Sequence, residues 1–329
     1  MTTSTATTMR AIVQDRYGSA DVLRPERIAV PGIAGNEVLV RVRAAGVDRG
    51  TWHLMTGTPY LLRLAFGLRG PRNPVPGRDV AGTVEAVGSE VRGFSVGDEV
   101  YGEAPGSFAE YAVARADKLV RKPANLSFEQ AAVVPISALT ALEALTVGRI
   151  KTGQRVLITG ATGGVGSYAV QLAKTFGAEV TGVAGPAKLD LVRALGADHV
   201  IDYTREDFAA TPGHYDLIID IAGIPTLSRL RRALTPTGTA VITGGEDGGR
   251  LTGGMNRQLR ALIVSLFVRQ RLTMFVNKVR GSDLTRLTEL IEAGRVTPSL
   301  DRTYPLDQAA DALRDLAAGK VRGKIAITL

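Results

Sequence analysis

The chain has no cysteine, few histidines and few aromatic residues. Because none of the 329 residues is cysteine, disulfides, thiolate metal sites and cysteine nucleophiles are excluded. The three histidines, His53, His199 and His214, are too few to predict a zinc site built on imidazoles, so we expect no metal. Aromatic residues make up only 5% of the chain, so aliphatic side chains must fill most of the core.

Long apolar runs are also missing. The longest, Ala261–Val268, is far too short to span a membrane. The Thr/Ser-rich start, up to Thr8, shows neither the apolar core nor the cleavage pattern of a signal peptide, and we expect it to be a loose tail. We therefore expect a cytoplasmic protein with no membrane partner.

The net charge of +8 has two interpretations, a nucleic-acid binder or a protein with solvated surface arginines. The basic residues are spread along the chain. One richer stretch, from Arg229 to Arg280, lacks the interleaved aromatic residues of single-strand binders. We expect no nucleic-acid partner, since a basic cleft also suits a polyanionic small molecule.

The first third of the chain predicts short strands punctuated by glycine turns, which is typical of a compact β-barrel. A length of 329 residues favours two domains. The predicted strands are Met9–Val13, Arg27–Val30, Glu37–Ala44, Val80–Val87, Glu99–Tyr101, Phe108–Val113 and Lys118–Val120.

From Ser127 the pattern changes. Ser127–Gln130 is a capping-box sequence, followed by a helical segment that runs to Leu145. Strands then alternate with helices, which predicts parallel βαβ units and a doubly wound sheet. The predicted strands are Arg155–Thr159, Glu179–Val183, His199–Ile201, Leu217–Ile221 and Ala240–Thr243, and the helices are Val165–Phe176, Lys188–Leu195 and Thr226–Leu234.

The end of the chain predicts helices at Asp283–Ala293 and Asp307–Ala318 and a closing strand at Lys324–Leu329. We expect that strand to rejoin the N-terminal barrel, which makes the doubly wound domain an insertion. The predicted α/β protein thus has a first domain over 1–128, a second over 129–272 and a C-terminal segment, 273–329, that completes the first.

The strongest local motif is Leu-Ile-Thr-Gly-Ala-Thr-Gly-Gly-Val-Gly at Leu157–Gly166, between a predicted strand and a predicted helix. Gly163 and Gly166 take the second and third positions of a G-x-G-x-x-G loop, and Ala161 takes the first. The second glycine lets the backbone approach a diphosphate, and the third lets helix and strand pack closely. The motif therefore predicts a dinucleotide site, with a tightly packed turn as the alternative. The expected contacts are Ala161, Thr162, Gly163, Gly164, Val165 and Gly166.

The segment after the second strand of this unit bears on the choice of coenzyme. No carboxylate follows Ala184 until Asp190, so the acid that would hold the ribose hydroxyls of NAD is missing. Lys188 and Tyr203 lie near enough in sequence to bind a 2′-phosphate beside Ala184. The pattern favours NADPH; the alternative is that Lys188 is a solvated lysine at a helix start.

From Met9 to Leu329 the chain resembles the medium-chain dehydrogenase/reductase superfamily, in particular its zinc-free, quinone oxidoreductase-like branch. Thr162 departs from the Ser, Ala or Gly usual there. Around the glycine loop the shared residues are Gly153, Gln154, Leu157, Gly163, Gly164, Gly166, Gln171 and Lys174. Elsewhere the shared segments are Ala45–Asp48, Pro76–Gly82, Val96–Val100, Gly106–Tyr111, Ala138–Ala144 and Arg322–Ile327.

The resemblance implies a GroES-like barrel built from both chain ends, with a Rossmann domain between them. The pair Lys188 and Tyr203 is similar to the pair that holds the 2′-phosphate in NADPH-using members. Zinc-dependent relatives carry a cysteine where this chain has Asp48 and a histidine where it has Arg78. The cysteine-rich lobe is absent between Gly102 and Ser107, and a cation such as Arg78 opposes Zn²⁺ binding.

The resemblance further implies NADPH-dependent reduction of quinones or α,β-unsaturated carbonyl compounds without a metal. Hydride addition leaves negative charge on the substrate oxygen, which needs hydrogen-bond donors and a proton. In the loop Gly46–Gly57, His53 stands where relatives often carry a tyrosine and is a candidate donor; alternatively it packs beside Trp52 with a local backbone partner. We expect Asp48 to orient the nicotinamide ribose or the substrate, and Tyr60 to line the pocket.

Other parts of the site follow from position. Thr140 is expected on the nicotinamide side, and Thr243 and Gly244 at the carboxyl end of a later strand, where the cleft lies. The arginine-flanked run Leu259–Val268 predicts a helix at the substrate pocket or at a subunit contact, in preference to a membrane-surface helix. Arg271–Val276 predicts an edge strand; in relatives such strands join two subunits, so we expect a homodimer.

Two alternatives to the quinone or enone reductase remain open. One is a zinc-free aldehyde or ketone reductase. The other is an NADPH-binding sensor or scaffold with no turnover.

Overall fold

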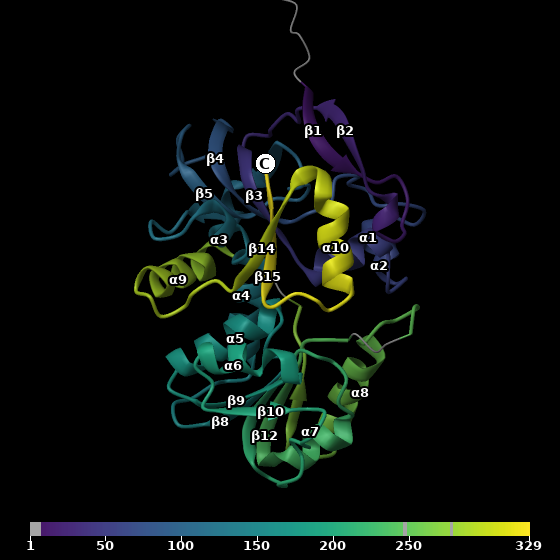
Figure 1. The fold of residues 1–329 in the computed structure, drawn as a ribbon, viewed down its shortest axis with the longest axis vertical. Helices are drawn as coiled ribbons and strands as arrows, with labels where there is room; N and C mark the ends of the chain where they lie inside the picture. The colour runs from purple at the N-terminus through teal and green to yellow at the C-terminus, as the bar shows by residue number, and fades with distance from the viewer. Residues whose placement is uncertain (1–7, 246–248, 277–278) are drawn as a thin grey trace, which may run out of the picture. The chain divides into compact units, whose positions relative to one another are not determined.

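A computed structural model describes residues 8–245, 249–276 and 279–329, so the predicted tail up to residue 7 lies outside the described residues. The chain forms two compact units. The first contains residues up to 136 together with 279–293 and 300–329, and the second contains 137–278 and 294–299. Both chain ends thus belong to the first unit (Figure 1). The divisions at 136 and 278 lie a few residues beyond the predicted junctions at 128 and 272.

The strands of the first unit pair antiparallel, except for β14 and β15, which pair parallel. A seven-stranded sheet has the order β14-β15-β3-β4-β5-β7, with β6 paired to β3, and β1 pairs with β2. The closing strand β15 pairs antiparallel with β3, which confirms that the end of the chain rejoins the N-terminal sheet. The strands are β1 (Thr8–Val13), β2 (Arg24–Ala29), β3 (Glu37–Val47), β4 (Asp79–Val87), β5 (Glu99–Glu103), β6 (Tyr111–Arg115), β7 (Leu119–Arg121), β14 (Leu300–Pro305) and β15 (Lys324–Thr328).

Local chemistry explains the helices that the sequence left unresolved. The segment Gly46–Gly57 was expected to be a loop, but the Asp48 carboxylate caps a helix, α1 (Arg49–Thr56), that ends at left-handed Gly57. The capping box at Ser127 is present, yet Pro135 splits the predicted helix into α3 (Phe128–Ala132) and α4 (Pro135–Val147). The other helices of the first unit are α2 (Leu62–Phe66), α9 (Gly281–Glu292) and α10 (Ala309–Ala317).

The second unit confirms the doubly wound prediction. Its six strands are parallel in the order β10-β9-β8-β11-β12-β13. The direction of winding changes between β8 and β11, which makes their carboxyl ends the topological switch point. The strands are β8 (Arg155–Thr159), β9 (Glu179–Ala184), β10 (His199–Asp202), β11 (Tyr215–Asp220), β12 (Leu234–Ile242) and β13 (Arg271–Thr273); the helices after α4 are α5 (Gly164–Thr175), α6 (Leu189–Ala194), α7 (Leu227–Ala233) and α8 (Met255–Ser265).

Several boundaries differ from the predictions. β12 begins at Leu234, before the predicted start, and β13 ends at Thr273 instead of Val276. A 3₁₀ turn, Pro186–Lys188, precedes α6, so Lys188 stands before the helix. Within the described ranges, no helix combines the length and apolar character needed to cross a bilayer.

Candidate active site

The glycine loop joins β8 to α5 and is shaped by close backbone approaches. Gly160 has a φ of 69°, a conformation that disfavours a side chain. A Cβ added to Gly166 would lie 2.1 Å from the carbonyl oxygen of Gly160, so only glycine fits there. The first hydrogen bond of α5 runs from the N–H of Ser167 to the oxygen of Gly163, at 2.9 Å. The three N–H groups before it, from Gly164 to Gly166, have no place in the intrahelical ladder, and N–H groups in this position suit an anion.

Gly163 is the position that tests the fit of a dinucleotide. It is the N-cap of α5 but offers no capping side chain. A Cβ placed there would meet only the oxygen of Gly160, 3.5 Å away, so the surface beside this glycine is open. An open backbone surface at a helix start is what a diphosphate requires. The predicted loop residues, Ala161–Gly166, therefore form one cradle.

A second group of predicted residues meets at the ends of β9 and β10. Asp202 pairs with Ala184 across the two strands, and the Tyr203 N–H donates to the Ala184 oxygen at 3.3 Å. A Cβ added to Gly185 would lie 3.2 Å from the Tyr203 hydroxyl, which places that hydroxyl over the turn that leads to Lys188. The structure thus brings the turn before Lys188, Ala184 and Tyr203 together.

Asp202 is a carboxylate near this group that the sequence reasoning overlooked. The Thr204 side chain and its N–H both donate to one Asp202 oxygen, at 2.7 and 2.9 Å. These hydrogen bonds lower the pKa of Asp202 and fix its carboxylate on the Thr204 turn. One carboxylate oxygen of Asp202 is therefore already hydrogen-bonded within its own turn.

The third group lies at the carboxyl ends of β8, β11 and β12. The N–H groups of Thr243 and Gly244 donate to the Asp220 backbone oxygen at 2.9 and 3.1 Å. A Cβ at Gly244 would lie 1.8 Å from the oxygen of Ile221, so this glycine is required for close packing. The predicted residues Thr243 and Gly244 therefore directly follow β12, next to the end of β11, whereas Thr140 lies half-buried in α4 of the same unit.

In the first unit, one carboxylate oxygen of Asp48 caps a helix and the other is not hydrogen-bonded to any described residue. Its Oδ1 accepts the N–H of Thr51 at 2.7 Å and so caps α1. Its Oδ2 is buried and has no hydrogen-bond partner among the described residues. An orphaned buried carboxylate oxygen is unusual and is suited to accept a hydroxyl from a ligand.

His53 lies on α1 and has a backbone partner. Its Nδ1 lies 2.7 Å from the carbonyl oxygen of Thr58, and its ring packs edge-on against Trp52 at 5.1 Å between centroids. A carbonyl oxygen only accepts, so Nδ1 carries the proton and Nε2 of the neutral ring is an acceptor. His53 can donate a proton from Nε2 only as the imidazolium.

Tyr60 lies between α1 and α2 and is 39% exposed. The Arg63 guanidinium stacks on both Tyr60 and Tyr17, at 4.4 and 4.6 Å from the ring centroids, and its Nε donates to the Gly57 oxygen. The Tyr17 hydroxyl in turn donates to the Gly67 oxygen at 2.6 Å. These contacts fix the segment between the two helices and present the edge of Tyr60 to solvent.

A cavity of about 340 Å³ opens in the first unit beside α1 and α2, with mostly apolar walls that include Leu54, Met55 and Phe66. Arg78 and Glu103 line it as well, joined by a short ion pair. Burial alone would lower the pKa of the Arg78 guanidinium, but the Glu103 carboxylate raises it above its ordinary value. None of the three predicted catalytic side chains is among the described residues that line the cavity.

Next to Arg78, Asp79 forms a buried ion pair that the sequence did not suggest. The Lys324 ammonium of β15 lies 3.3 Å from Asp79 Oδ2, and the N–H of Ile136 donates to Oδ1 at 2.9 Å. Burial raises the pKa of Asp79 to about 7, and attraction by Lys324 offsets only part of that rise. The pair joins the last strand of the chain to β4.

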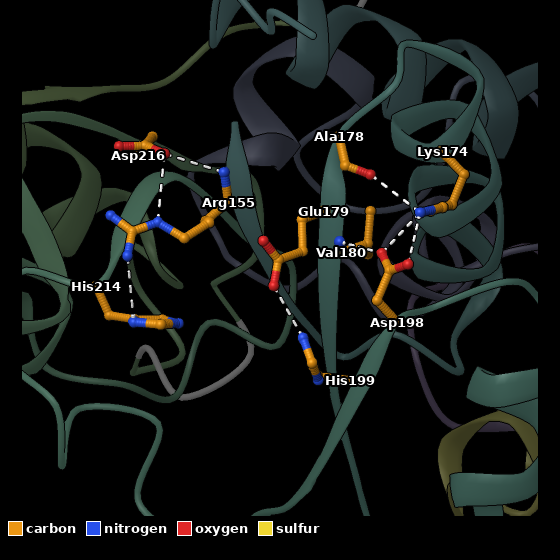
Figure 2. Close-up of polar contacts among 9 residues, drawn as sticks. All are labelled: Arg155, Lys174, Ala178, Glu179, Val180, Asp198, His199, His214 and Asp216. Carbon is orange, nitrogen blue, oxygen red and sulfur yellow. Dashed lines mark hydrogen bonds and ion pairs between the residues drawn. The ribbon is translucent and has the colours of Figure 1, made fainter. Parts of the chain in front are cut away.

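The other two histidines, which Figure 2 labels, lie at the amino ends of the parallel strands, opposite the carboxyl ends that form the candidate site. His199 Nε2 lies 2.9 Å from Glu179, and His214 Nδ1 lies 3.4 Å from an Arg155 nitrogen. Cofactors bind at the carboxyl ends of such strands. His199 and His214 therefore have no part in the candidate site.

The geometry defines a dinucleotide-binding oxidoreductase fold with a GroES-like unit. Two family models match the chain: an alcohol dehydrogenase GroES-like domain over residues 34–124 and a zinc-binding dehydrogenase over 195–327. The first spans Asp48 and Arg78.

Relatives cover almost the whole chain. A 2-methylene-furan-3-one reductase of Solanum lycopersicum is 34% identical over 97% of this chain and 79% of its own length. An NADPH-dependent alkenal/one oxidoreductase, chloroplastic, of Arabidopsis thaliana is 35% identical over the same shares. The solved quinone oxidoreductase of Coxiella burnetii matches with a TM-score of 0.87 and 30% identity over 98% of this chain and all of that one. The chain belongs to the quinone oxidoreductase-like branch of the medium-chain dehydrogenase/reductase superfamily, whose members lack zinc.

Proposed function

We propose that this chain is an NADPH-dependent oxidoreductase that reduces quinones or α,β-unsaturated carbonyl compounds by hydride transfer without a metal. The observation that carries the proposal is the cradle at Gly163, an open backbone surface at a helix start beside the switch point of a parallel sheet. The names of the relatives, a furanone reductase, an alkenal/one oxidoreductase and a quinone oxidoreductase, support the substrate class.

The side chains around the turn after β9 support NADPH over NADH. The Lys188 turn lies beneath the Tyr203 hydroxyl, and the nearby Asp202 carboxylate is bonded to Thr204. A 2′-phosphate would therefore meet a cation and a hydroxyl. Ala184 supplies the backbone beneath the adenosine ribose.

The chain's own residues must hold the substrate and stabilise the charge that develops on its oxygen. When bound, the reduced nicotinamide supplies the hydride. We propose that the cavity of about 340 Å³ receives the substrate, because its apolar walls suit a flat conjugated ring and Arg78 offers a guanidinium to the oxygen.

The three predicted catalytic residues take separate roles in this proposal. Asp48 accepts a hydroxyl of the nicotinamide ribose or the substrate at its orphaned Oδ2. His53 donates a proton from Nε2 as the imidazolium, with Nδ1 held by Thr58. Tyr60 lines the approach to the pocket, fixed by Arg63. On the cofactor side, Thr140 and Thr243 face the nicotinamide.

A substrate panel with purified protein tests the proposal. Loss of NADPH absorbance would be followed with a benzoquinone, an α,β-unsaturated ketone, its saturated analogue and an aldehyde. We expect turnover with the quinone and the unsaturated ketone, the latter yielding the saturated ketone as product. Turnover of the saturated ketone or aldehyde to an alcohol would instead favour the zinc-free carbonyl reductase, and NADPH binding without any turnover would favour a sensor or scaffold.

We also propose that two copies associate through α8. Exposed apolar residues of α8 and of the turn after it include Leu259, Ile263, Leu266 and Phe267, of which the last two follow the helix and are 80% and 82% exposed. β13 stands at the edge of the sheet in the same unit. Apolar exposure of this extent is typical of an interface. Light scattering should report a dimer that Leu266→Asp with Phe267→Asp dissociates; a monomeric wild type would contradict the proposal.

The cytoplasmic location remains a prediction. The Arabidopsis relative is named as chloroplastic, so family membership does not decide the compartment. Imaging the protein in cells with a fluorescent tag at one end or at the other tests the location.

A further inference from the structure

We propose that Asp220 and Arg257 are positioning residues that set the nicotinamide half of the coenzyme site. Neither residue belongs to the glycine loop or to the predicted catalytic set. The inference rests on the proposed function, since it concerns the same coenzyme. It is carried by a buried hydrogen-bond network that spans the switch point of the parallel sheet.

Asp220 is the last residue of β11 and is fully buried. Its Oδ1 accepts the hydroxyl of Thr159, the last residue of β8, at 2.6 Å. The same hydroxyl oxygen accepts the N–H groups of Ile221 and Ala222 at 3.1 and 3.2 Å. The ends of the two strands that diverge at the switch point are thus fastened to each other.

The backbone of Asp220 fastens the next strand as well. Its carbonyl oxygen accepts the N–H groups of Thr243 and Gly244. On the other side, Gly160 approaches Ala222 so closely that an added Cβ would lie 3.2 Å from the Ala222 nitrogen. One aspartate therefore fixes three segments that face the coenzyme: the start of the glycine loop, residues 221–222 and residues 243–244.

Arg257 of α8 neutralises this aspartate. Its Nη2 lies 2.5 Å from Asp220 Oδ2, and its Nε and Nη2 donate to the Pro225 oxygen at 3.0 and 2.6 Å. The Arg257 side chain is 18% exposed and lines a cavity of about 490 Å³ between residues 223–228 and the start of α8. Without Arg257, an uncompensated carboxylate would lie beneath a site that binds a polyanion.

The sheet order assigns this network to the nicotinamide half. The 2′-phosphate contacts lie at the ends of β9 and β10, and the diphosphate cradle lies at β8. A dinucleotide that starts over β9 and crosses the switch point must continue over β11 and β12. Stability alone does not account for the pair, because a buried ion pair is on average no more stabilising than well-packed apolar residues.

Three variants and two probes test the inference. Arg257→Met, Asp220→Asn and the double variant would be titrated with NADPH and with adenosine 2′,5′-bisphosphate, which has the 2′-phosphate but no nicotinamide half. We expect Arg257→Met to raise the Kd for NADPH about 10-fold or more and to lower kcat about 100-fold, because small misplacements of the reacting atoms are costly. The Kd for the bisphosphate should change less than about 2-fold, since that part of the site is unaltered.

The double variant guards against simple misfolding. It removes both charges but leaves an amide that can still accept the Thr159 hydroxyl, so we expect NADPH affinity to recover most of the loss. Arg229→Met is the matched control, because Arg229 pairs with Asp207 on the surface of the same unit, with both side chains about half exposed. It should leave both Kd values unchanged.

The possible outcomes separate the inference from the proposed function. Unchanged NADPH affinity and kcat in Arg257→Met would overturn the inference while leaving the enzyme proposal intact. Equal weakening of both probes would also overturn it, since it would indicate general disruption of the unit. Failure of the wild type to bind NADPH at all would instead sink the proposed function.

Discussion

The two units offer ligands different kinds of surface. The second unit presents backbone: Gly163 is open and Gly166 is pinned against Gly160, so recognition depends on peptide groups that are fixed by the fold. The first unit presents side chains on α1 and on the segment after it, such as His53 and the exposed Tyr60, held by local contacts. Coenzyme binding should therefore be sensitive to added atoms in the second unit, whereas substrate chemistry should be sensitive to functional groups in the first.

Each unit also contains a fully buried aspartate paired with a basic residue. Asp79 pairs with Lys324 and joins the end of the chain to β4. Asp220 pairs with Arg257 and joins α8 to the end of β11. The same chemistry thus joins β15 to β4 in one unit and, in our proposal, positions a binding site in the other, so a buried ion pair has no single role.

The largest effect is expected in the glycine loop. Gly166→Val would place side-chain atoms where even a Cβ is 2.1 Å from the Gly160 oxygen, so we expect NADPH binding to be lost, by more than about 100-fold in Kd, together with a lower Tm. Calorimetric titration and thermal melts measure both.

Gly163→Ala should separate the effect of the glycine loop on folding from its effect on coenzyme binding. Its Cβ has no neighbour closer than 3.5 Å, so the Tm should stay within about 2 °C of wild type. The methyl group would nevertheless occupy the approach of the diphosphate, and the Kd for NADPH should rise about 10-fold. Wild-type affinity in Gly163→Ala would show that the cradle does not hold the coenzyme.

The next effect concerns the buried pair of the first unit. Above the Asp79 pKa of about 7, where the carboxylate is charged, Asp79→Asn leaves the Lys324 ammonium buried without its counter-charge and should lower the unfolding free energy by about 3–5 kcal/mol, measured by urea denaturation. The double variant Asp79→Leu with Lys324→Met should be close to wild type in stability. A single variant as stable as the double one would contradict the importance of the pairing.

The same pair predicts a pH dependence of stability. Asp79 has a folded-state pKa of about 7 against an ordinary value of 3.8, so between these values the folded state holds one proton more than the unfolded state. The stability contribution is fully present below the lower value and is lost as the pH rises toward the upper one, with a slope of at most about 1.4 kcal/mol per pH unit. The double variant should lack this slope in the pH profile of the unfolding free energy.

The next prediction concerns kcat and the proposed proton donor on α1, His53. His53→Gln keeps a donor near Thr58 but removes the imidazole ring and its Nε2, so we expect kcat to fall about 100-fold with NADPH affinity preserved. His199→Gln is the control, because His199 lies at the amino end of β10, opposite the candidate site. An equal effect of the two variants would remove His53 from the mechanism.

The last prediction concerns the difference between NADPH and NADH in their KM values. Lys188→Ala should raise KM for NADPH about 10-fold, the equivalent of one charge-assisted hydrogen bond, and leave KM for NADH within about 2-fold. Steady-state kinetics with both coenzymes measure it. Similar changes for both would place Lys188 away from the 2′-phosphate.

Much of the site could be predicted because it is encoded locally. The glycine spacing from Ala161 to Gly166 and the missing acid after Ala184 are sequence features, and the structure brings the corresponding residues together. α1 was missed because Asp48 was considered only as a ligand-facing residue, although an aspartate is also a strong N-cap. A signal for Asp220 did exist: it is a charged residue ending a buried apolar strand, Leu217–Ile219.

The α/β architecture, the return of the last strand to the N-terminal sheet and the backbone cradle could be predicted from the sequence, because they depend on periodicity and on residues such as glycine whose effects are local. Which charged side chains form ion pairs depends on the tertiary structure. Asp79 and Lys324 are separated by most of the chain, and Thr159, Asp220 and Arg257 come from three elements. Such pairings depend on strand order and burial, which place distant residues within a few ångströms of each other.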